Sequence, residues 1–176
     1  KYERHDIMRI STKGRYALAA VISMSQQHNN GEYITVLSIS EKLGISKIYL
    51  EQVFSLLKRG GLVISVKGAQ GGYQLSRAPE HISVYEILSA VESSLFEGAE
   101  ETVAERSPDI ETAMRLTVFE KLDESVKDAL SKVTLDDLVS ATEKHKQENA
   151  MMFYICYFFS SAMNIASVKA AQVLRR

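Results

Sequence analysis

Residues 47–58 carry polar side chains of types that suit contacts with a nucleic acid. Lys47 and Lys58 are cations that can pair with phosphate groups, and the Tyr49 hydroxyl can donate to a phosphate while its ring packs. Gln52 has the donor and acceptor that match adenine in the major groove, and Glu51 can accept a hydrogen bond from cytosine N4. Because a merely solvated helix can show a similar face, the surrounding elements must decide between the two interpretations.

The same segment contains an apolar stripe that predicts a helix. The stripe follows the i, i+3, i+4, i+7 spacing of a buried helical face, which leaves the polar residues mostly outside it. Its members are Leu50, Val53, Phe54 and Leu57. Ser46 is a good residue to begin this helix, and Gly60-Gly61 is typical of a helix end.

Two shorter patterns before Ser46 predict further helices. Thr35 begins a short helix that Gly44 stops, only two residues before Ser46. A helix, a tight glycine-containing turn and a second helix are the signature of a helix-turn-helix. An earlier helix follows Ser11 and Thr12 and ends in the turn-forming residues 28–31. Its apolar positions are Tyr16, Ala17, Ala20, Val21 and Met24.

After Gly61 the sequence predicts a β-hairpin. Residues 62–66 and 73–76 are rich in strand formers and flank a glycine-rich tip. In this tip, Lys67 and Gly68 can approach a phosphate, and Gln70 can donate and accept at a base edge. A phosphate cradle of the Walker type is disfavoured because the tip precedes a strand and lacks the Lys-Ser/Thr pair. An ordinary surface turn is the alternative. The predicted fold is mainly α with a small β-hairpin: a winged helix-turn-helix.

Beyond Pro79 the sequence predicts a linker and a dimerisation helix. Ser83 and Glu86 form a capping box at the start of a helix, and residues 97–107 predict a loop. A long helix from Asp109 carries an apolar stripe longer than this small domain needs, so a second copy of the chain is expected to cover it. The stripe consists of Ile110, Met114, Val118, Leu122, Val126, Ala129 and Val133. Thr134 then begins one more short helix.

The charge distribution divides the chain. The 176 residues are 45% hydrophobic and 24% charged, with a formal net charge of -1, which excludes collagen-like, disulfide-scaffold and wholly disordered classes. Residues 8–77 contain nine basic and three acidic residues, whereas residues 78–155 contain seven basic and seventeen acidic ones. A basic half beside an acidic half is typical of a polyanion-binding module joined to a partner domain, although scatter in short windows is an alternative.

The sequence provides no motif for catalysis or metal binding. A Ser/His/Asp order, HExxH and GxSxG are absent, and the paired acids lie at capping or loop positions, so no enzyme is predicted. Cys156 is the one cysteine, and the four histidines do not have zinc-ligand spacing. These features predict a reducing, cytoplasmic location and neither a metal nor a cofactor.

The predicted domains leave both ends of the chain outside. Residues 8–78 are expected to form the winged helix and residues 79–155 the linker and dimerisation region, while residues 1–7 are an extension. Residues 151–168 are 18 mostly apolar residues interrupted by serines and an asparagine. This pattern favours a tail that packs on the dimer, or an added extension, over a membrane anchor. The role of residues 156–176 is unassigned.

Three segments resemble the Rrf2 family of bacterial winged-helix transcription regulators. They are MRISTKGRYA at 8–17, ISKIYLEQ at 45–52 and GLVISVKGAQGGY at 61–73. The resemblance runs to about residue 155, and it implies a homodimer built on the long helix that binds double-stranded DNA of dyad symmetry. The residues that it implies for DNA contacts are Lys13, Ser46, Tyr49, Glu51, Gln52, Lys67, Gly68 and Gln70.

Many members of that family hold an iron–sulfur cluster, and this chain departs from their pattern. Aligning the long helix places the ligand positions near Glu101, Ser107, Ala113 and Leu116, and none of these can supply a thiolate. The cysteine-free loop and the segment MMFYI at 151–155 look more like the cluster-free subgroup that represses cysteine and sulfur metabolism. That subgroup implies regulation by cysteine synthase or a small thiol-metabolism effector. The alternative function is a winged-helix scaffold for protein contacts without specific DNA binding.

Overall fold

The structure is a computed structural model that describes residues 10–26, 33–68, 71–92 and 103–152. The chain divides into two units, residues 1–139 and residues 140–176. Expectations for residues 1–7, 28–31, Gln70, 97–102 and 156–176 therefore lie outside the described residues.

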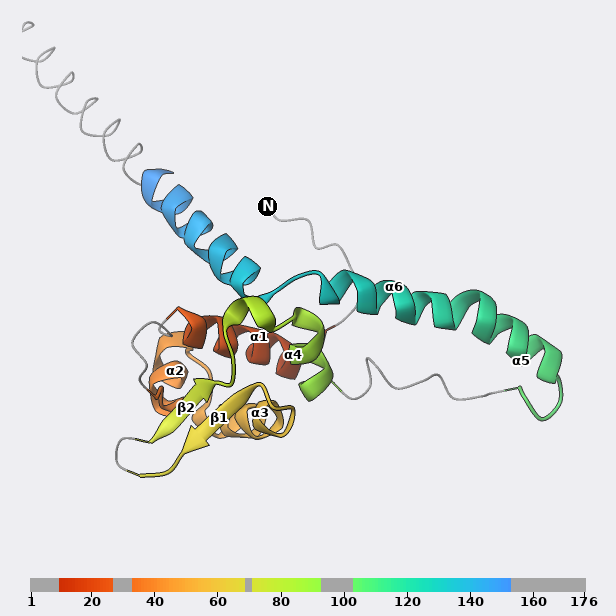
Figure 1. Ribbon diagram of the computed structural model, residues 1–176, viewed down its shortest axis with the longest axis horizontal. Helices are drawn as coiled ribbons and strands as arrows, with labels where there is room; N and C mark the ends of the chain where they lie inside the picture. The colour runs from red at the N-terminus through yellow and green to blue at the C-terminus, as the bar shows by residue number, and fades with distance from the viewer. Residues whose placement is uncertain (1–9, 27–32, 69–70, 93–102, 153–176) are drawn as a thin grey trace, which may run out of the picture. The chain divides into compact units, whose positions relative to one another are not determined.

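Three helices form the predicted helix-turn-helix and its support (Figure 1). They are α1 (Thr12–Ser25), α2 (Val36–Leu43) and α3 (Lys47–Arg59). The Ser11 hydroxyl caps α1 by accepting from the Gly14 N–H, and the Thr35 hydroxyl caps α2 by accepting from the Ser38 N–H. Gly44 ends α2 in the left-handed conformation, with φ at 65°, and α3 begins three residues later. These boundaries agree with the sequence prediction.

The hairpin consists of β1 (Val63–Val66) and β2 (Gly72–Leu75), which pair antiparallel with Val63 opposite Leu75. We call residues 63–75 the wing. Ile34, just before α2, pairs with β2 at Tyr73 through two backbone hydrogen bonds of 2.8 Å. A Cβ atom at Gly72 would lie 2.6 Å from the Ile34 carbonyl oxygen, so a side chain there would break this close approach.

The hydrophobic core joins the winged helix to the chain that follows it. The short helix η2 (Pro79–His81) leads into α4 (Val84–Val91), whose capping box between Ser83 and Glu86 is present as predicted. The core therefore crosses the boundary predicted at residue 78. Its buried members are Ala17, Ala20, Val21, Met24, Ile34, Ile39, Leu50, Val53, Phe54, Leu57, Leu62, Val63, Leu75, Ile82, Ile87, Val91 and Leu135.

The predicted long helix contains a π-helical segment and ends at Ser131, two residues before Val133. It consists of α5 (Pro108–Met114), a π-helical segment η3 (Arg115–Phe119) and α6 (Glu120–Ser131). Val133 lies beyond its end, because the chain there pairs with the start of α4: the Val84 N–H donates to the Val133 carbonyl and the Leu135 N–H to that of Ile82. The prediction that Val133 belongs to this helix is therefore wrong.

The final described helix is longer than predicted, since residues 135–152 are all helical. The Thr134 hydroxyl accepts from the Asp137 N–H at 3.1 Å, which is the predicted cap. Within the described ranges, no helix is long and apolar enough to cross a membrane.

Candidate nucleic-acid interface

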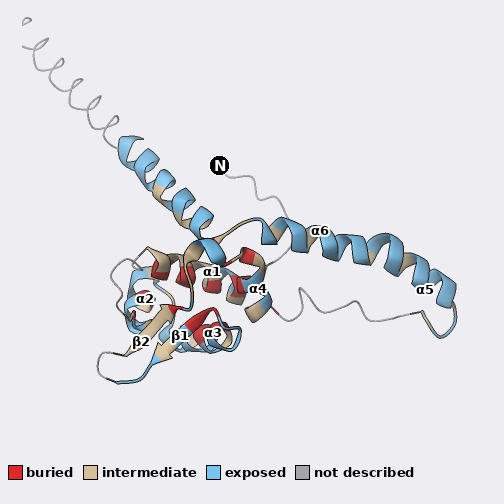
Figure 2. Ribbon diagram, viewed as in Figure 1, coloured by how far each residue is buried: buried red, intermediate tan, exposed pale blue. Residues whose placement is uncertain are grey.

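The two faces of α3 differ completely in exposure. The four residues of the predicted stripe, Leu50, Val53, Phe54 and Leu57, are 0% exposed. The opposite side is exposed, and Figure 2 shows α3 with both red and pale blue portions. Its exposed residues are Lys47, Ile48, Glu51, Gln52, Ser55, Lys58 and Arg59. The core therefore fixes the orientation of α3 and leaves a polar surface with cations at both ends.

Lys47 and Glu51 form an ion pair on the exposed face. The lysine Nζ lies 3.6 Å from Glu51 Oε1, and both side chains are about half exposed, at 55% and 52%. An exposed i, i+4 pair of this kind contributes only ~0.3 to 0.5 kcal/mol to stability. Because the pair is weak, either side chain can exchange its partner for a phosphate or a base edge at little cost.

The start of α3 leaves the Ser46 hydroxyl without a capping bond. Ser46 occupies the N-cap position, as predicted, but its side chain does not accept from the helix. The turn before it is held instead by Ser40, whose hydroxyl donates to the Ile45 carbonyl at 2.6 Å. Ser46 is exposed, so its hydroxyl is available to a ligand at the positive end of the helix.

Tyr49 links α3 to α1. Its ring is half-buried and packs edge-on against Tyr16, with the ring centroids 5.3 Å apart. The ring thus packs as expected, next to the first turns of α1, where Lys13 is half-buried. The contact holds the N-terminal part of α1 in a fixed position relative to the exposed face of α3.

Lys58 has a contact that the sequence did not indicate. Its Nζ donates to the Ser65 hydroxyl on β1 at 2.5 Å. This bond joins the C-terminal end of α3 to the wing. Lys58 remains exposed, and its ammonium has two further protons, so the bond to Ser65 leaves the predicted phosphate contact available.

The tip of the wing depends on glycine. Gly68 has a φ of 124°, which side-chain-bearing residues rarely adopt, and its carbonyl accepts from the Gly71 N–H at 3.0 Å. Lys67 next to it is exposed. Gln70 falls outside the described residues, so of the predicted wing contacts the structure places Lys67 and Gly68.

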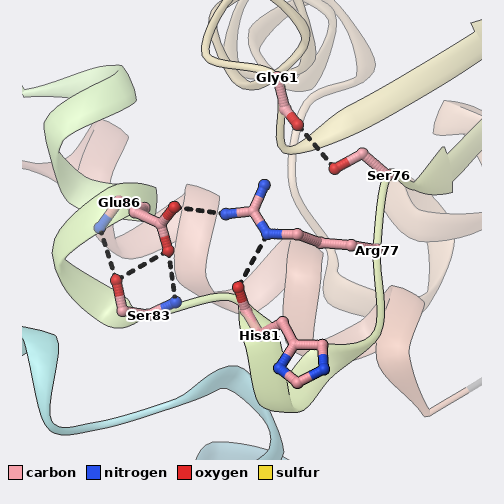
Figure 3. Close-up of polar contacts among 6 residues, drawn as sticks. All are labelled: Gly61, Ser76, Arg77, His81, Ser83 and Glu86. Carbon is pink, nitrogen blue, oxygen red and sulfur yellow. Dashed lines mark hydrogen bonds and ion pairs between the residues drawn. The ribbon is translucent and has the colours of Figure 1, made fainter.

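A polar cluster joins Ser76 and Arg77, which follow the wing, to Gly61 before β1 and to the start of α4 (Figure 3). The Ser76 hydroxyl donates to the Gly61 carbonyl at 2.6 Å, and Arg77 Nε donates to the His81 carbonyl at 2.8 Å. The Arg77 guanidinium also pairs with Glu86, which closes the capping box with Ser83. Arg77 is one of the nine cations of the basic half, but the structure shows it in an internal ion pair.

Glu86 should make stability depend on pH. Partial burial raises its pKa, but the hydrogen bonds from the Ser83 backbone and hydroxyl and the charge of Arg77 outweigh burial and hold the pKa below 4.5. When the pKa of a carboxyl falls on folding, the group stabilises the protein at pH values above the pKa that it has in the unfolded chain. This stabilisation is lost as the pH falls through the pKa of the group in the folded protein.

We therefore expect Glu86→Gln to be less stable than the wild type at neutral pH by at most ~1 kcal/mol. The difference should shrink as the pH falls below 4.5, which urea unfolding at a series of pH values would measure. A difference that stays constant across this range would contradict the assigned role.

The helical spacing of the buried stripe already leaves Ile48 outside it, and Ile48 is 71% exposed in the first turn of α3. Sequence reasoning missed two features of this region. Arg59 is exposed directly after Lys58, and Glu92 is 5% exposed against the start of α1. The contact of Glu92 joins residues 78 or more positions apart, and no local pattern predicts it.

Comparison with known proteins gives a consistent family match. A family model described as Rrf2, iron-dependent transcriptional regulator, matches residues 10–141. The transcriptional regulator CymR of Bacillus subtilis is 36% identical over 148 residues, which cover 84% of this chain and 100% of CymR. IscR of Pectobacterium carotovorum is 36% identical over 136 residues, which cover 77% of this chain and 82% of IscR.

A solved structure agrees with these matches. The structure of CymR, described as the global cysteine regulator of B. subtilis, has a TM-score of 0.61 and 32% identity, and the match covers 77% of this chain and 98% of that one. The matched proteins are transcriptional regulators and not enzymes.

The matching family is described as iron-dependent, so an iron–sulfur cluster is the metal centre to compare with the residues of this chain. The family resemblance implies ligand positions near Ser107, Ala113 and Leu116. The side chains of Ala113 and Leu116 have no donor atom, and the Ser107 hydroxyl is no substitute for a thiolate. Across the ranges that the structure describes, no group of three or more His, Cys, Asp or Glu could hold a metal ion. These residues do not fit an iron–sulfur cluster.

Proposed function

The chain belongs to the Rrf2 family of DNA-binding transcriptional regulators, and we propose that it is a repressor that binds its operator as a dimer through α3 and the wing. The observation that supports this assignment is the division of α3, whose apolar stripe is fully buried while Lys47, Glu51 and Gln52 are exposed. A helix with this orientation can present base-reading side chains to a major groove.

The side chains on this surface suit different parts of the duplex. Glu51 and Gln52 carry the acceptors and donors that read base edges, whereas Lys13, Lys47, Lys58 and Lys67 suit phosphates. The Ser46 and Tyr49 hydroxyls and the Gly68 backbone suit the sugar-phosphate chain, and Gln70 is proposed at a base edge. Charge therefore positions the protein, and α3 supplies specificity.

The exposed apolar side chains of α5, η3 and α6 support dimerisation. Ile110, Val118 and Leu122 are 55%, 53% and 58% exposed, and Met114 and Val126 are half-buried. Large apolar residues exposed in a row at helical spacing are typical of an interface. Ala129 completes the set. Two copies related by a two-fold axis would place their α3 helices in successive major grooves, roughly 34 Å apart, on an operator with dyad symmetry.

The domain roles follow from this arrangement. Residues 8–78 are proposed to bind DNA, and residues 79–155 to dimerise and receive the signal. Because a regulator works where the chromosome is, we place it in the bacterial cytoplasm. The match to CymR, described as a cysteine regulator, supports a role in cysteine or sulfur metabolism. Cysteine synthase or a small thiol metabolite is the proposed signal.

Selection of genomic fragments with the purified full chain, followed by footprinting, tests this function. We expect a protected palindrome upstream of sulfur-metabolism genes and a change of affinity when cysteine synthase or a thiol metabolite is added. Failure to select any sequence over random duplex would refute specific DNA binding. Selection of a palindrome at unrelated genes would refute only the metabolic assignment.

Gln52→Ala and Lys67→Ala should have different effects on binding. Gln52→Ala should reduce discrimination at one base pair of each half-site by ~1 to 3 kcal/mol, because it removes a base contact. Lys67→Ala should weaken binding to all duplexes alike and lower the slope of log K against log salt by about one for each phosphate that is no longer neutralised. Anisotropy titrations on matched and mismatched duplexes at several salt concentrations measure both. An equal loss of affinity on every duplex for both variants would contradict the division of roles.

A further inference from the structure

Ile48 is the most exposed of the large hydrophobic residues in the described part of the chain. Its exposed fraction is 71%, against 0% for the four residues of the buried stripe of α3. At roughly 100° of rotation per residue, Ile48 points about 170° away from the mean direction of that stripe. Ile48 is thus at the centre of the surface that α3 presents outward.

The neighbours of Ile48 are the residues that could read bases. Gln52 lies one turn further along the same line, and the pair of Lys47 and Glu51, 3.6 Å apart, lies on one side. The first turn of a recognition helix is the part that reaches base edges. Ile48 occupies this turn with a side chain that can neither donate nor accept a hydrogen bond.

An apolar side chain at this place can recognise one feature of the major groove. The C5-methyl of thymine is the apolar group on the major-groove edge of the four bases. Because isoleucine branches at Cβ, one χ1 rotamer dominates in a helix, so the side chain is ordered before it meets the DNA. Scattered exposed apolar residues are common, so the argument depends on the central position of Ile48 among the polar residues of the first turns.

We propose that Ile48 is a specificity residue that contacts the C5-methyl group of a thymine in each half-site, next to the base read by Gln52. This inference rests on the proposed function, in which α3 lies in the major groove. It adds an apolar contact to the hydrogen-bond contacts and requires a thymine at one fixed position of the operator.

Replacement of thymidine by deoxyuridine tests the proposal, since uracil lacks only the methyl group. In anisotropy titrations of the full chain on its selected operator, each thymine pair related by the dyad is replaced in turn. One replacement should weaken wild-type binding roughly fourfold per half-site, or roughly fifteenfold when both are changed, as expected for one buried methyl each. Ile48→Ala should bind the thymine and uracil duplexes equally.

Ser55→Ala is the matched control, because Ser55 is exposed on the same side of α3 one turn beyond Gln52. It should keep the wild-type ratio between thymine and uracil. The proposal would be overturned if no deoxyuridine replacement weakened wild-type binding, or if Ile48→Ala kept the wild-type ratio between the thymine and uracil duplexes. Either result would leave the proposed function intact. A protein that selects no duplex would overturn both.

Discussion

Leu122→Glu is expected to convert the protein to a monomer and to weaken operator binding by ~10²- to 10⁴-fold. Leu122 is 58% exposed in α6, between Val118 and Val126 on the proposed dimer face. In the dimer, the new carboxylate would be buried without a partner, and the cost of its desolvation would oppose association. In a dimer, binding of one subunit to its half-site raises the effective concentration of the second subunit at the other half-site, and a monomer lacks this gain.

The fold of each subunit should survive this change. An exposed residue contributes little to the core, so a substitution there normally alters stability by no more than ~0.5 kcal/mol. Sedimentation would measure the oligomeric state, and circular dichroism would show that the helices persist. Titration on a single half-site should give nearly the wild-type affinity of one subunit.

Lys121→Gln is the matched control for Leu122→Glu. It changes the charge of the same exposed helix by the same one unit, but it lies outside the proposed dimer face. We expect it to remain dimeric and to bind the full operator within a few-fold of the wild type. A dimeric Leu122→Glu, or equal effects of the two variants, would refute the proposed interface.

The elements that sequence patterns predicted best are those with a complete local signal. The buried stripe of α3, the left-handed Gly44 and the capping box of Ser83 and Glu86 are all present at the predicted positions. Each of these features depends on residues within one or two turns of each other, so their spacing in the sequence is enough to predict the local structure. The polar face of α3 followed from the same stripe, because burial of one side leaves the other outside.

The predictions that failed concern the ends and the interior of the longer helices. The apolar spacing continues from Ile110 to Val133, but α6 ends at Ser131 because Val133 makes a backbone hydrogen bond to the start of α4. The π-helical segment η3 also interrupts the stripe at Arg115–Phe119. A tertiary backbone pairing and a local change of helical pitch leave no trace in hydrophobic periodicity, so the sequence could not indicate either.

Long-range polar contacts were equally inaccessible to sequence reasoning. The lysine side chain of Lys58 suits a phosphate contact, which the sequence alone indicates. Only the structure shows its additional hydrogen bond to Ser65 on the wing. The same is true of Arg77, which charge counting assigns to the basic surface and which pairs with Glu86. Net charge therefore overstates the number of cations that the candidate interface can use.

Glu92→Ala is expected to cause the largest loss of stability among the polar substitutions, about 2 to 4 kcal/mol. Glu92 follows α4 and is 5% exposed. Its Oε1 accepts from the Ser11 N–H at 3.0 Å, the Ser11 hydroxyl at 2.6 Å and the Gly14 N–H at 3.2 Å. Removing the carboxylate would leave the Ser11 N–H and hydroxyl without this acceptor, and the Gly14 N–H with the Ser11 hydroxyl alone. It would also remove a negative charge from the positive end of α1.

Thermal unfolding should register this destabilisation as a decrease in Tm of about 5 to 15 °C. Glu92→Gln keeps an acceptor oxygen of the same size, so its decrease should be less than half as large. Glu105→Ala, which removes one exposed carboxylate, is the charge-matched control and should lie within ~0.5 kcal/mol of the wild type. A Glu92→Ala variant as stable as this control would refute the role of the contact.

Gly14 offers an independent test of the same contact. A Cβ atom at Gly14 would lie 2.3 Å from Glu92 Oε1, so Gly14→Ala must displace the carboxylate and should itself be destabilising. In the Glu92→Ala background the clash with the carboxylate is gone, which leaves one close contact, 2.7 Å to Cγ2 of the Ile10 side chain. Alanine also gains about 1 kcal/mol of helix propensity over glycine. The two substitutions should therefore be strongly non-additive, with Gly14→Ala much less harmful in the double variant. Additive effects would mean that residues 14 and 92 act separately, and that the end of α4 does not hold α1 beside the candidate DNA surface.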